Sequence, residues 1–269
     1  MLGSFVVQLQ PKERVSLGSS LGRSLHGLFM ELIRQGSPDL AEELHAPARA
    51  KPFTVSPLRG RFSRPEGHLV ASPEETYWVR YTALSEPVFA ALSHILLGKV
   101  LYRDTVTLEG QPFTVTDIAV EPKEGNPWGG LSTFERLYER AHPERQITLG
   151  FYSPTTFRQG DHNLPLPVPL SVFGGYLYKW RAFCDIPLSE GLLDFVEQQV
   201  VVERHRIQTK VMRYSPHHQF VGFTGECTFR VLGEDEQHLR EVNGLADFAF
   251  YAGTGQKTTQ GMGQTRRIG

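Results

Sequence analysis

Histidine and lysine residues near the start of the chain have the types and spacing that proton-transfer chemistry requires. His45 follows a segment expected to be a short helix, and Lys51 stands six residues later in a stretch with no acidic residue. Histidine takes or gives a proton near neutral pH, and lysine neutralises developing anionic charge. A loop between a helix and a strand could turn both side chains into one cleft. On spacing alone, a surface histidine that ends a helix is the favoured interpretation.

His26 is a further candidate, inside the helix expected over residues 21–34. The alternative to a catalytic role is that His26 is a partly buried helix residue. A metal site is not expected. His217 and His218, at an expected hairpin turn, lack two further ligands at suitable spacing, and Asp161 beside His162 is a weak pair.

The last seventeen residues contain two Gly-x-Gly pairs, a lysine between them and two arginines after them, with no acid: Gly253, Gly255, Lys257, Gly261, Gly263, Arg266 and Arg267. Glycine allows positive φ and close backbone approach, and clustered amide groups bind anions. The segment is therefore expected to hold a sugar-phosphate backbone. Its spacing fits neither a Walker A loop nor a Rossmann fingerprint. The alternative is a flexible tail, which the apolar stretch 245–251 before it disfavours.

Composition sets limits on the function. The chain has 269 residues, 40% of them hydrophobic, and a net charge of −1, as in an ordinary globular protein. No apolar run has the length of a membrane span, and the N-terminus reads as a strand, not as a signal peptide. Two distant cysteines indicate neither a disulfide framework nor a zinc site, so a cytoplasmic protein is expected. Basic residues are nevertheless clustered locally, which allows binding of RNA.

The expected RNA-contacting side chains lie in these clusters. Arg59 stands in the acid-free stretch around Lys51. The others belong to the strand expected over residues 200–214: Arg204, Arg206, Lys210 and Arg213. Alternate spacing places some of them on one strand face. That face could equally be only solvated.

The order of expected elements gives the fold. Strands at 5–9, 53–56, 76–84, 100–108 and 113–120 alternate with helices at 21–34, 39–44 and 87–97, which is the β-α-β-β-α-β order of a ferredoxin-like unit. The second half repeats it with a strand at 147–152, a helix at 170–183, a hairpin at 200–232, a helix at 235–248 and a short strand after Gly261. Tyr176, Tyr178, Trp180 and Phe183 are interpreted as core. The prediction is an α+β protein with two tandem ferredoxin-like domains, residues 1–125 and 126–269.

The glycine segment resembles the C-terminal signature of the CRISPR-associated repeat-processing endoribonucleases, members of the repeat-associated mysterious protein superfamily. The signature is Gly-hydrophobic-Gly, a basic residue, then Gly-hydrophobic-Gly, and Thr254 departs from it. The likeness continues in segments 25–33, 38–45, 51–57 and 147–158, so it covers nearly the whole chain in order.

The resemblance implies a metal-independent endoribonuclease that cleaves CRISPR precursor RNA within repeats. The 2′-hydroxyl attacks and leaves 2′,3′-cyclic phosphate and 5′-hydroxyl ends. It implies proton transfer by His45 with support from Lys51, and no cofactor. Some members use a tyrosine where this chain has Met30, so His26 is a candidate for the missing role. The alternatives are a repeat-RNA-binding protein with weak or no cleavage and a subunit of a CRISPR effector complex. A homodimer stays open, and no membrane partner is expected.

Overall fold

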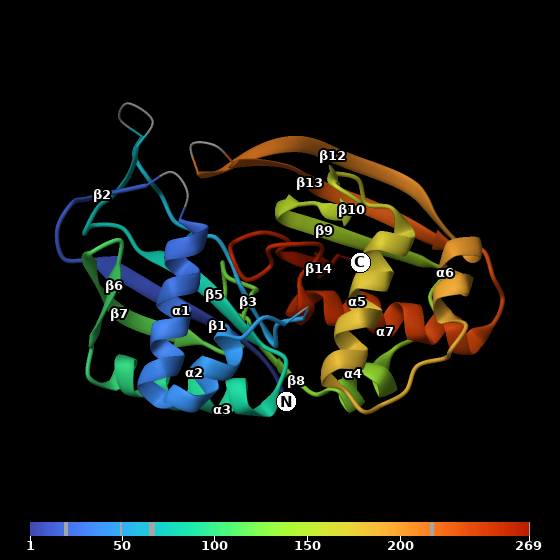
Figure 1. Ribbon diagram of the computed structural model, residues 1–269, viewed down its shortest axis with the longest axis horizontal. Helices are drawn as coiled ribbons and strands as arrows, with labels where there is room; N and C mark the ends of the chain where they lie inside the picture. The colour runs from blue at the N-terminus through green and yellow to red at the C-terminus, as the bar shows by residue number, and fades with distance from the viewer. Residues whose placement is uncertain (19–20, 49, 65–67, 216–217, 269) are drawn as a thin grey trace. The chain divides into compact units, whose positions relative to one another are not determined.

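The chain separates into two compact units (Figure 1). The structure, a computed structural model, describes residues 1–18, 21–48, 50–64, 68–215 and 218–268, without the side chains of 213–215 and 218. The first unit comprises Met1–Leu131 and Thr259–Gly261, and the second comprises Ser132–Thr258 and Met262–Gly269. No helix among these residues is long and apolar enough to cross a bilayer.

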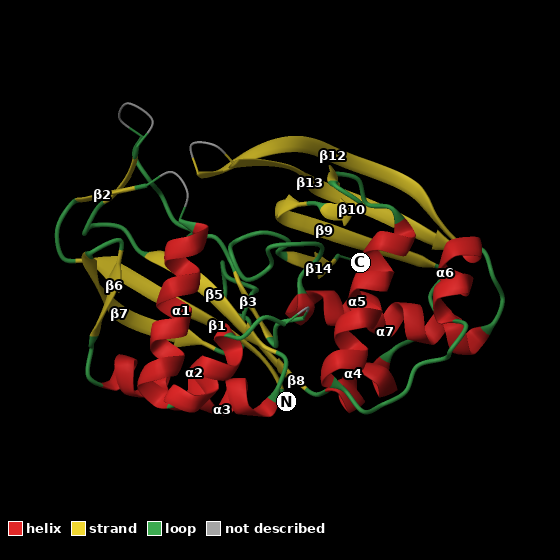
Figure 2. Cartoon of the chain, in the orientation of Figure 1, coloured by secondary structure: helices red, strands yellow, loops and turns green. Residues whose placement is uncertain are grey.

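In the first unit, helices pack on an antiparallel sheet in which five strands follow one another in a single order (Figure 2). Its elements, with β8 at the boundary, are β1 (Leu2–Pro11), β2 (Val15–Leu17), α1 (Gly22–Gly36), α2 (Pro38–His45), β3 (Phe53–Val55), β4 (Leu69–Ala71), β5 (Tyr77–Ala83), α3 (Glu86–Leu101), β6 (Thr105–Leu108), β7 (Gln111–Ala119) and β8 (Gly130–Ser132). The strand order is β3-β5-β1-β7-β6, with β8 also on β1. This is the ferredoxin-like order, and the α1 and α3 helices contact each other and the sheet.

The helices of this unit form where the apolar spacing predicts them. Leu25, Phe29 and Ile33 lie on the buried face of α1, and Phe29 stacks on Phe53 of β3 at 4.0 Å between ring centroids. Pro38 begins α2, where its fixed φ suits a first helical turn. The α1 face and β3 are therefore held against each other by aromatic packing.

One predicted strand was wrong at its start. Residues 100–104 do not belong to a strand, because α3 continues to Leu101 and β6 begins only at Thr105. Arg103 has φ 47°, and Asp104 forms a 2.7 Å ion pair with Lys99 of the last helical turn. Gly98 and Lys99 suggested an earlier helix end, but α3 continues through both residues.

The second unit repeats the same order. Its elements are α4 (Phe134–Arg140), β9 (Gln146–Thr155), β10 (Phe157–Gln159), β11 (His162–Leu164), α5 (Pro169–Phe183), α6 (Leu192–Gln199), β12 (Val200–Ser215), β13 (His218–Val231), α7 (Glu236–Ala252) and β14 (Thr265–Arg267). The sheet order is β12-β13-β9-β14, and the short strand expected after Gly261 is β14. The prediction missed α6 and gave the β10–β11 hairpin as a loop. The α6 helix has eight residues and each hairpin strand has three, so both are too short for their pattern to stand out.

The core of the second unit lies between its sheet and α5 and α7. Tyr176 and Trp180 of α5 are buried, whereas Tyr178 on the opposite face is 43% exposed. Of the four aromatic residues interpreted as core, Tyr178 is therefore a surface residue. Trp180 packs edge-on against Phe248 of α7, with 5.4 Å between centroids.

Candidate active site and RNA-contacting residues

Lys51 binds the backbone at the end of α2, on both sides of His45. His45 is the last residue of the helix and is exposed. The Lys51 ammonium donates to the carbonyl oxygens of Leu44 at 2.7 Å and Ala46 at 2.5 Å, the two residues that flank His45. A cation at a helix C-terminus satisfies carbonyl groups that have no intrahelical partner. The lysine charge is thereby fixed at the carbonyl groups on either side of the histidine, and a shared cleft for the two side chains stays a prediction.

His26 lies on the half-buried face of α1. Its Nδ1 atom is 3.1 Å from the carbonyl oxygen of Thr259, a residue of the C-terminal glycine segment. Its ring also stacks on Phe53, with 5.7 Å between centroids and 28° between planes. Met30, one turn further along α1, is buried in the core of the first unit at 6% exposure. The thioether there is part of the packing and cannot transfer a proton.

The strand β3 joins these features. Lys51 stands two residues before it, and Phe53 at its start packs on His26. The carbonyl oxygen of Val55 at its end accepts a 3.0 Å hydrogen bond from the amide of Gly261. Within the first unit, one short strand thus contacts α1 and the glycine segment and follows directly from the His45–Lys51 loop.

The glycine segment is packed, so the flexible-tail alternative is wrong. All four glycines have positive φ: 62° at Gly253, 76° at Gly255, 89° at Gly261 and 71° at Gly263. A Cβ atom at Gly255 would lie 2.3 Å from the carbonyl oxygen of Thr156, and one at Gly263 would lie 2.1 Å from that of Thr254. Only glycine fits such contacts.

Three of the four paired glycines donate their amide groups inside the protein. Gly253, Gly261 and Gly263 donate their N–H groups to the carbonyls of Ala249, Val55 and Pro154. These three donors therefore already have an acceptor. Contact of the segment with RNA stays a prediction that depends on its side chains, of which Lys257 is half-buried with its ammonium 5.9 Å from the Phe220 ring centroid.

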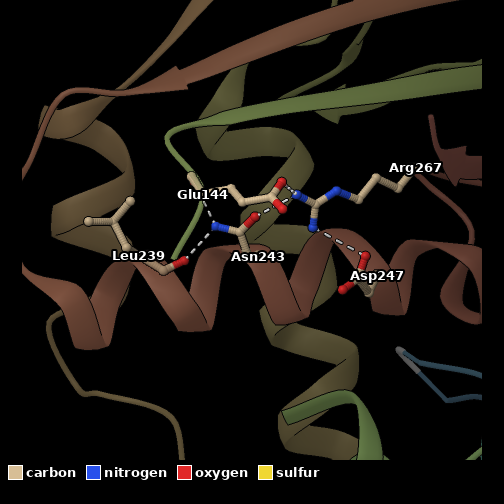
Figure 3. A network of polar contacts seen from close by, with 5 residues as sticks. All are labelled: Glu144, Leu239, Asn243, Asp247 and Arg267. Carbon is tan, nitrogen blue, oxygen red and sulfur yellow. Dashed lines mark hydrogen bonds and ion pairs between the residues drawn. The ribbon is translucent and has the colours of Figure 1, made fainter. Parts of the chain in front are cut away.

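The two arginines at the end of the segment differ in surroundings. The Arg266 guanidinium lies over the Tyr152 ring at 5.7 Å. Arg267, counted in the sequence with the phosphate-binding group, is instead held by the protein (Figure 3). Its guanidinium contacts Glu144 at 2.5 Å, Asn243 at 2.8 Å and Asp247 at 3.3 Å. Burial raises the pKa of Asp247, which Arg267 lowers only in part. Arg267 therefore holds β14 on α7.

The basic strand β12 presents exposed arginines. Arg204 pairs with Thr228 and Arg206 with Glu226 of β13. Both arginines line a hollow of about 320 Å³ together with Thr148, His205, Glu226 and Thr228. Lys210 is exposed further along the strand. The Arg213 side chain and the histidine pair at the turn lie outside the described residues.

Arg59 differs from these residues because it is half-buried. Its backbone pairs with Trp78 through two 2.8 Å hydrogen bonds, and burial lowers the pKa of its guanidinium. In the weak metal pair, Asp161 instead forms a 3.3 Å ion pair with Arg158. Its carboxylate is thus directed to an arginine.

Two features had no signal in the sequence. The His26–Thr259 contact joins residues 233 positions apart. The ammonium of Lys179 on α5 is enclosed by the Ala252 carbonyl at the end of α7 and by the Thr258 hydroxyl at 3.2 Å. Although the residue as a whole is half-buried, burial of its charged end lowers the pKa of Lys179 to about 8. A lysine in an amphipathic helix pattern gave no reason to expect this.

Known proteins resemble the chain over both units. A family model described as the CRISPR Cas6 N-terminal domain matches residues 1–139, and one described as CRISPR-associated endoribonuclease Cas6 matches residues 149–265. The chain is 25% identical over 257 residues to the CRISPR-associated endoribonuclease Cas6 of Mycobacterium tuberculosis. The match covers 95% of this chain and 74% of that protein. It is 24% identical over 249 residues to that of Streptococcus thermophilus, with 90% and 89% covered.

Solved structures agree with these matches. A structure described as a Cas6 product complex is 29% identical, covers 100% of both chains and has a TM-score of 0.84. A Thermus thermophilus Cas6 structure is 27% identical, covers 100% of this chain and 98% of the other, and has a TM-score of 0.74. The two tandem ferredoxin-like folds are thus found along the whole chain.

Proposed function

The chain belongs to the CRISPR-associated endoribonuclease family Cas6, and from this premise we propose that it cuts CRISPR precursor RNA within each repeat by metal-independent acid–base catalysis. The O2′ atom bonds to the adjacent phosphorus and the P–O5′ bond breaks. A base takes the proton of the 2′-hydroxyl, and an acid gives one to the leaving O5′. The products carry a 2′,3′-cyclic phosphate and a 5′-hydroxyl.

The observation that carries this proposal is the placement of a fixed ammonium beside an exposed histidine. Lys51 uses two of its three N–H groups on the carbonyls of Leu44 and Ala46. We assign the third N–H to a phosphate oxygen, where it would neutralise charge that develops in the transition state. His45 between the two carbonyls serves one proton transfer, and His26 serves the other.

The first test uses repeat RNA in excess EDTA. Wild type should make a single cut in each repeat and leave a cyclic phosphate on the upstream product, as read by mass spectrometry. His45→Ala should lose roughly 10²–10⁴-fold in single-turnover rate, the usual contribution of one general acid or base. His94→Ala removes an exposed helix histidine outside the proposed site and is the matched control. Equal rates for both variants, or cleavage that stops in EDTA, would contradict the proposal.

A second comparison separates charge from packing at Lys51. Lys51→Arg keeps a cation near the end of α2, whereas Lys51→Met leaves the carbonyls of Leu44 and Ala46 without it. We expect Lys51→Met to lower the cleavage rate at saturating RNA and Lys51→Arg to recover part of the loss. Loss in both, with unchanged RNA affinity, would mean that the loop geometry matters and the charge does not.

Four basic residues of the second unit, two exposed and two half-buried, are proposed to contact the phosphate backbone of the RNA. Arg204 and Arg206 line one hollow, and Lys257 and Arg266 lie over aromatic rings. Such contacts make binding strongly dependent on salt.

One observation favours a second function, in which the protein holds repeat RNA and cleaves it weakly or not at all. The buried Met30 cannot supply the proton transfer that a tyrosine would at that place. Tight binding of repeat RNA by wild type without any cut would support this alternative.

A further inference from the structure

The contact between His26 and Thr259 fixes more than the position of a ring. A carbonyl oxygen has no hydrogen to give, so the 3.1 Å contact requires that His26 Nδ1 carries the hydrogen and donates it. In the neutral ring the lone pair then lies on Nε2. We propose that the backbone carbonyl of Thr259 is a positioning group that selects this tautomer of His26 and directs Nε2 to the proton transfer. The inference rests on the proposed function in that His26 acts in RNA cleavage.

The ring has little freedom to turn away from this arrangement. Phe53 stacks on the His26 ring with 5.7 Å between ring centroids, and Phe53 is itself held by Phe29 with 4.0 Å between centroids. When Nε2 takes a proton, the Nδ1–H···O=C bond becomes charge-assisted and strengthens. Thr259 would thus stabilise the imidazolium that forms during the reaction, by a neutral dipole and without a carboxylate.

Contacts of the two residues that follow Thr259 hold its carbonyl in place. Gly261 donates to Val55, and the carbonyl oxygen of Gln260 lies so near α1 that a Cβ atom at Gly22 would be 2.2 Å from it. Gly22 and His26 are four residues apart, so they lie on one face of α1. The glycine at residue 22 therefore lets the segment reach the histidine.

Two glycines of α1 provide a matched pair of variants. Gly22→Ala places a methyl group against the Gln260 carbonyl and should push the segment off His26. Gly27→Ala, next to the histidine in the same helix, meets nothing within 4 Å. Gly27→Ala raises helix propensity by about 1 kcal/mol, and Gly22→Ala, at the first residue of α1, does not lower it, so only the clash distinguishes them unfavourably.

The experiment measures the tautomer directly in the full-length protein. Long-range ¹H–¹⁵N correlation spectra of ¹⁵N-histidine-labelled protein distinguish Nδ1–H from Nε2–H, and His26→Gln identifies the signal. Wild type and Gly27→Ala should show the Nδ1–H form. Gly22→Ala should show the Nε2–H form or a mixture, and its single-turnover cleavage should fall roughly 10- to 100-fold, part of a general base's contribution. Its affinity for repeat RNA should stay within about twofold.

Gly261→Ala is the second variant, because an alanine strains the backbone at φ 89° two residues after Thr259, meets no atom closer than 3.6 Å and leaves the α1 sequence unchanged. It should shift the tautomer in the same direction as Gly22→Ala. An Nε2–H form in wild type would overturn the inference, as would a changed tautomer with an unchanged cleavage rate. If His26→Gln cleaved RNA as fast as wild type, His26 would have no part in the reaction, and the proposed function would fail at this residue. The spectra of wild type and Gly22→Ala test the contact separately from that outcome.

Discussion

Gly263→Ala is expected to destabilise the second unit far more than an ordinary substitution at a positive φ. Gly263 has φ 71°, and an alanine Cβ atom there would lie 2.1 Å from the carbonyl oxygen of Thr254. The same two residues are joined by a 2.8 Å hydrogen bond from the Thr254 amide to the Gly263 carbonyl. Relief of the clash therefore requires that this bond lengthen or break. Gly160→Ala is the control, since Gly160 has φ 55° in the same unit and its Cβ would meet nothing within 4 Å.

The magnitude follows from these contacts. An alanine in the left-handed region costs about 1–2 kcal/mol, which both variants share. The clash with backbone adds about 1–3 kcal/mol, as overpacking does in cores, and the lost hydrogen bond adds about 1 kcal/mol. We expect roughly 3–6 kcal/mol for Gly263→Ala against about 1–2 kcal/mol for Gly160→Ala.

Differential scanning calorimetry measures the difference, with far-ultraviolet circular dichroism as a check of the fold at low temperature. At about 2–4 °C for each kcal/mol, Gly263→Ala should lower the Tm by roughly two to three times as much as Gly160→Ala. Equal shifts would refute the reasoning. They would show that the backbone can move aside at Gly263 and that the glycine is not required for packing.

Three further predictions test side chains of the second unit. The double variant Arg204→Gln, Arg206→Gln should weaken RNA binding and reduce the slope of log K against log salt by about 2, as measured by fluorescence anisotropy at several salt concentrations; an unchanged slope would exclude phosphate contacts. Because burial lowers the pKa of Lys179 to about 8 from about 10.4 in the unfolded chain, the unfolded state binds the extra proton between these pH values, and the free energy of unfolding should rise with pH there. Urea denaturation of Lys179→Met should lack this rise. Arg267→Met should cost roughly 2–3 kcal/mol at pH 7 and less as the pH is lowered, because burial raises the pKa of Asp247 and its carboxyl group then takes up a proton, and Asp247→Asn in that background should recover part of the loss.

The architecture could be predicted because its signals are local. The apolar spacing of α1 and α5 and the alternation of the long hairpin strands predicted both β-α-β-β-α-β orders. Element ends were less certain, since α3 passes through Gly98 and Lys99 and continues to Leu101. Short elements such as α6 form against neighbours that the sequence does not place beside them.

Within the site, the same distinction decides what could be predicted. His45 and Lys51 are close in sequence, and the helix and strand expected on either side of them are found as α2 and β3. Their bonds through Leu44 and Ala46 are local backbone contacts of that loop. The partner of His26 is 233 residues away, and it is a backbone carbonyl, which carries no residue identity that a sequence could reveal.

The glycine segment shows why the type of a residue predicts its backbone conformation and not what it contacts. Four glycines in two pairs correctly indicated positive φ and close backbone approach. Close approach, however, serves a ligand or another part of the same chain, and the sequence does not distinguish the two. In this fold the carbonyls of Thr156 and Thr254 occupy the space that the glycines leave, and three of the glycine amides are already donated. Within the first unit, Gly261 donates to the carbonyl of Val55 two residues after Thr259, whose own carbonyl lies at His26. A substitution at a glycine can therefore lower cleavage without any contact between that glycine and RNA.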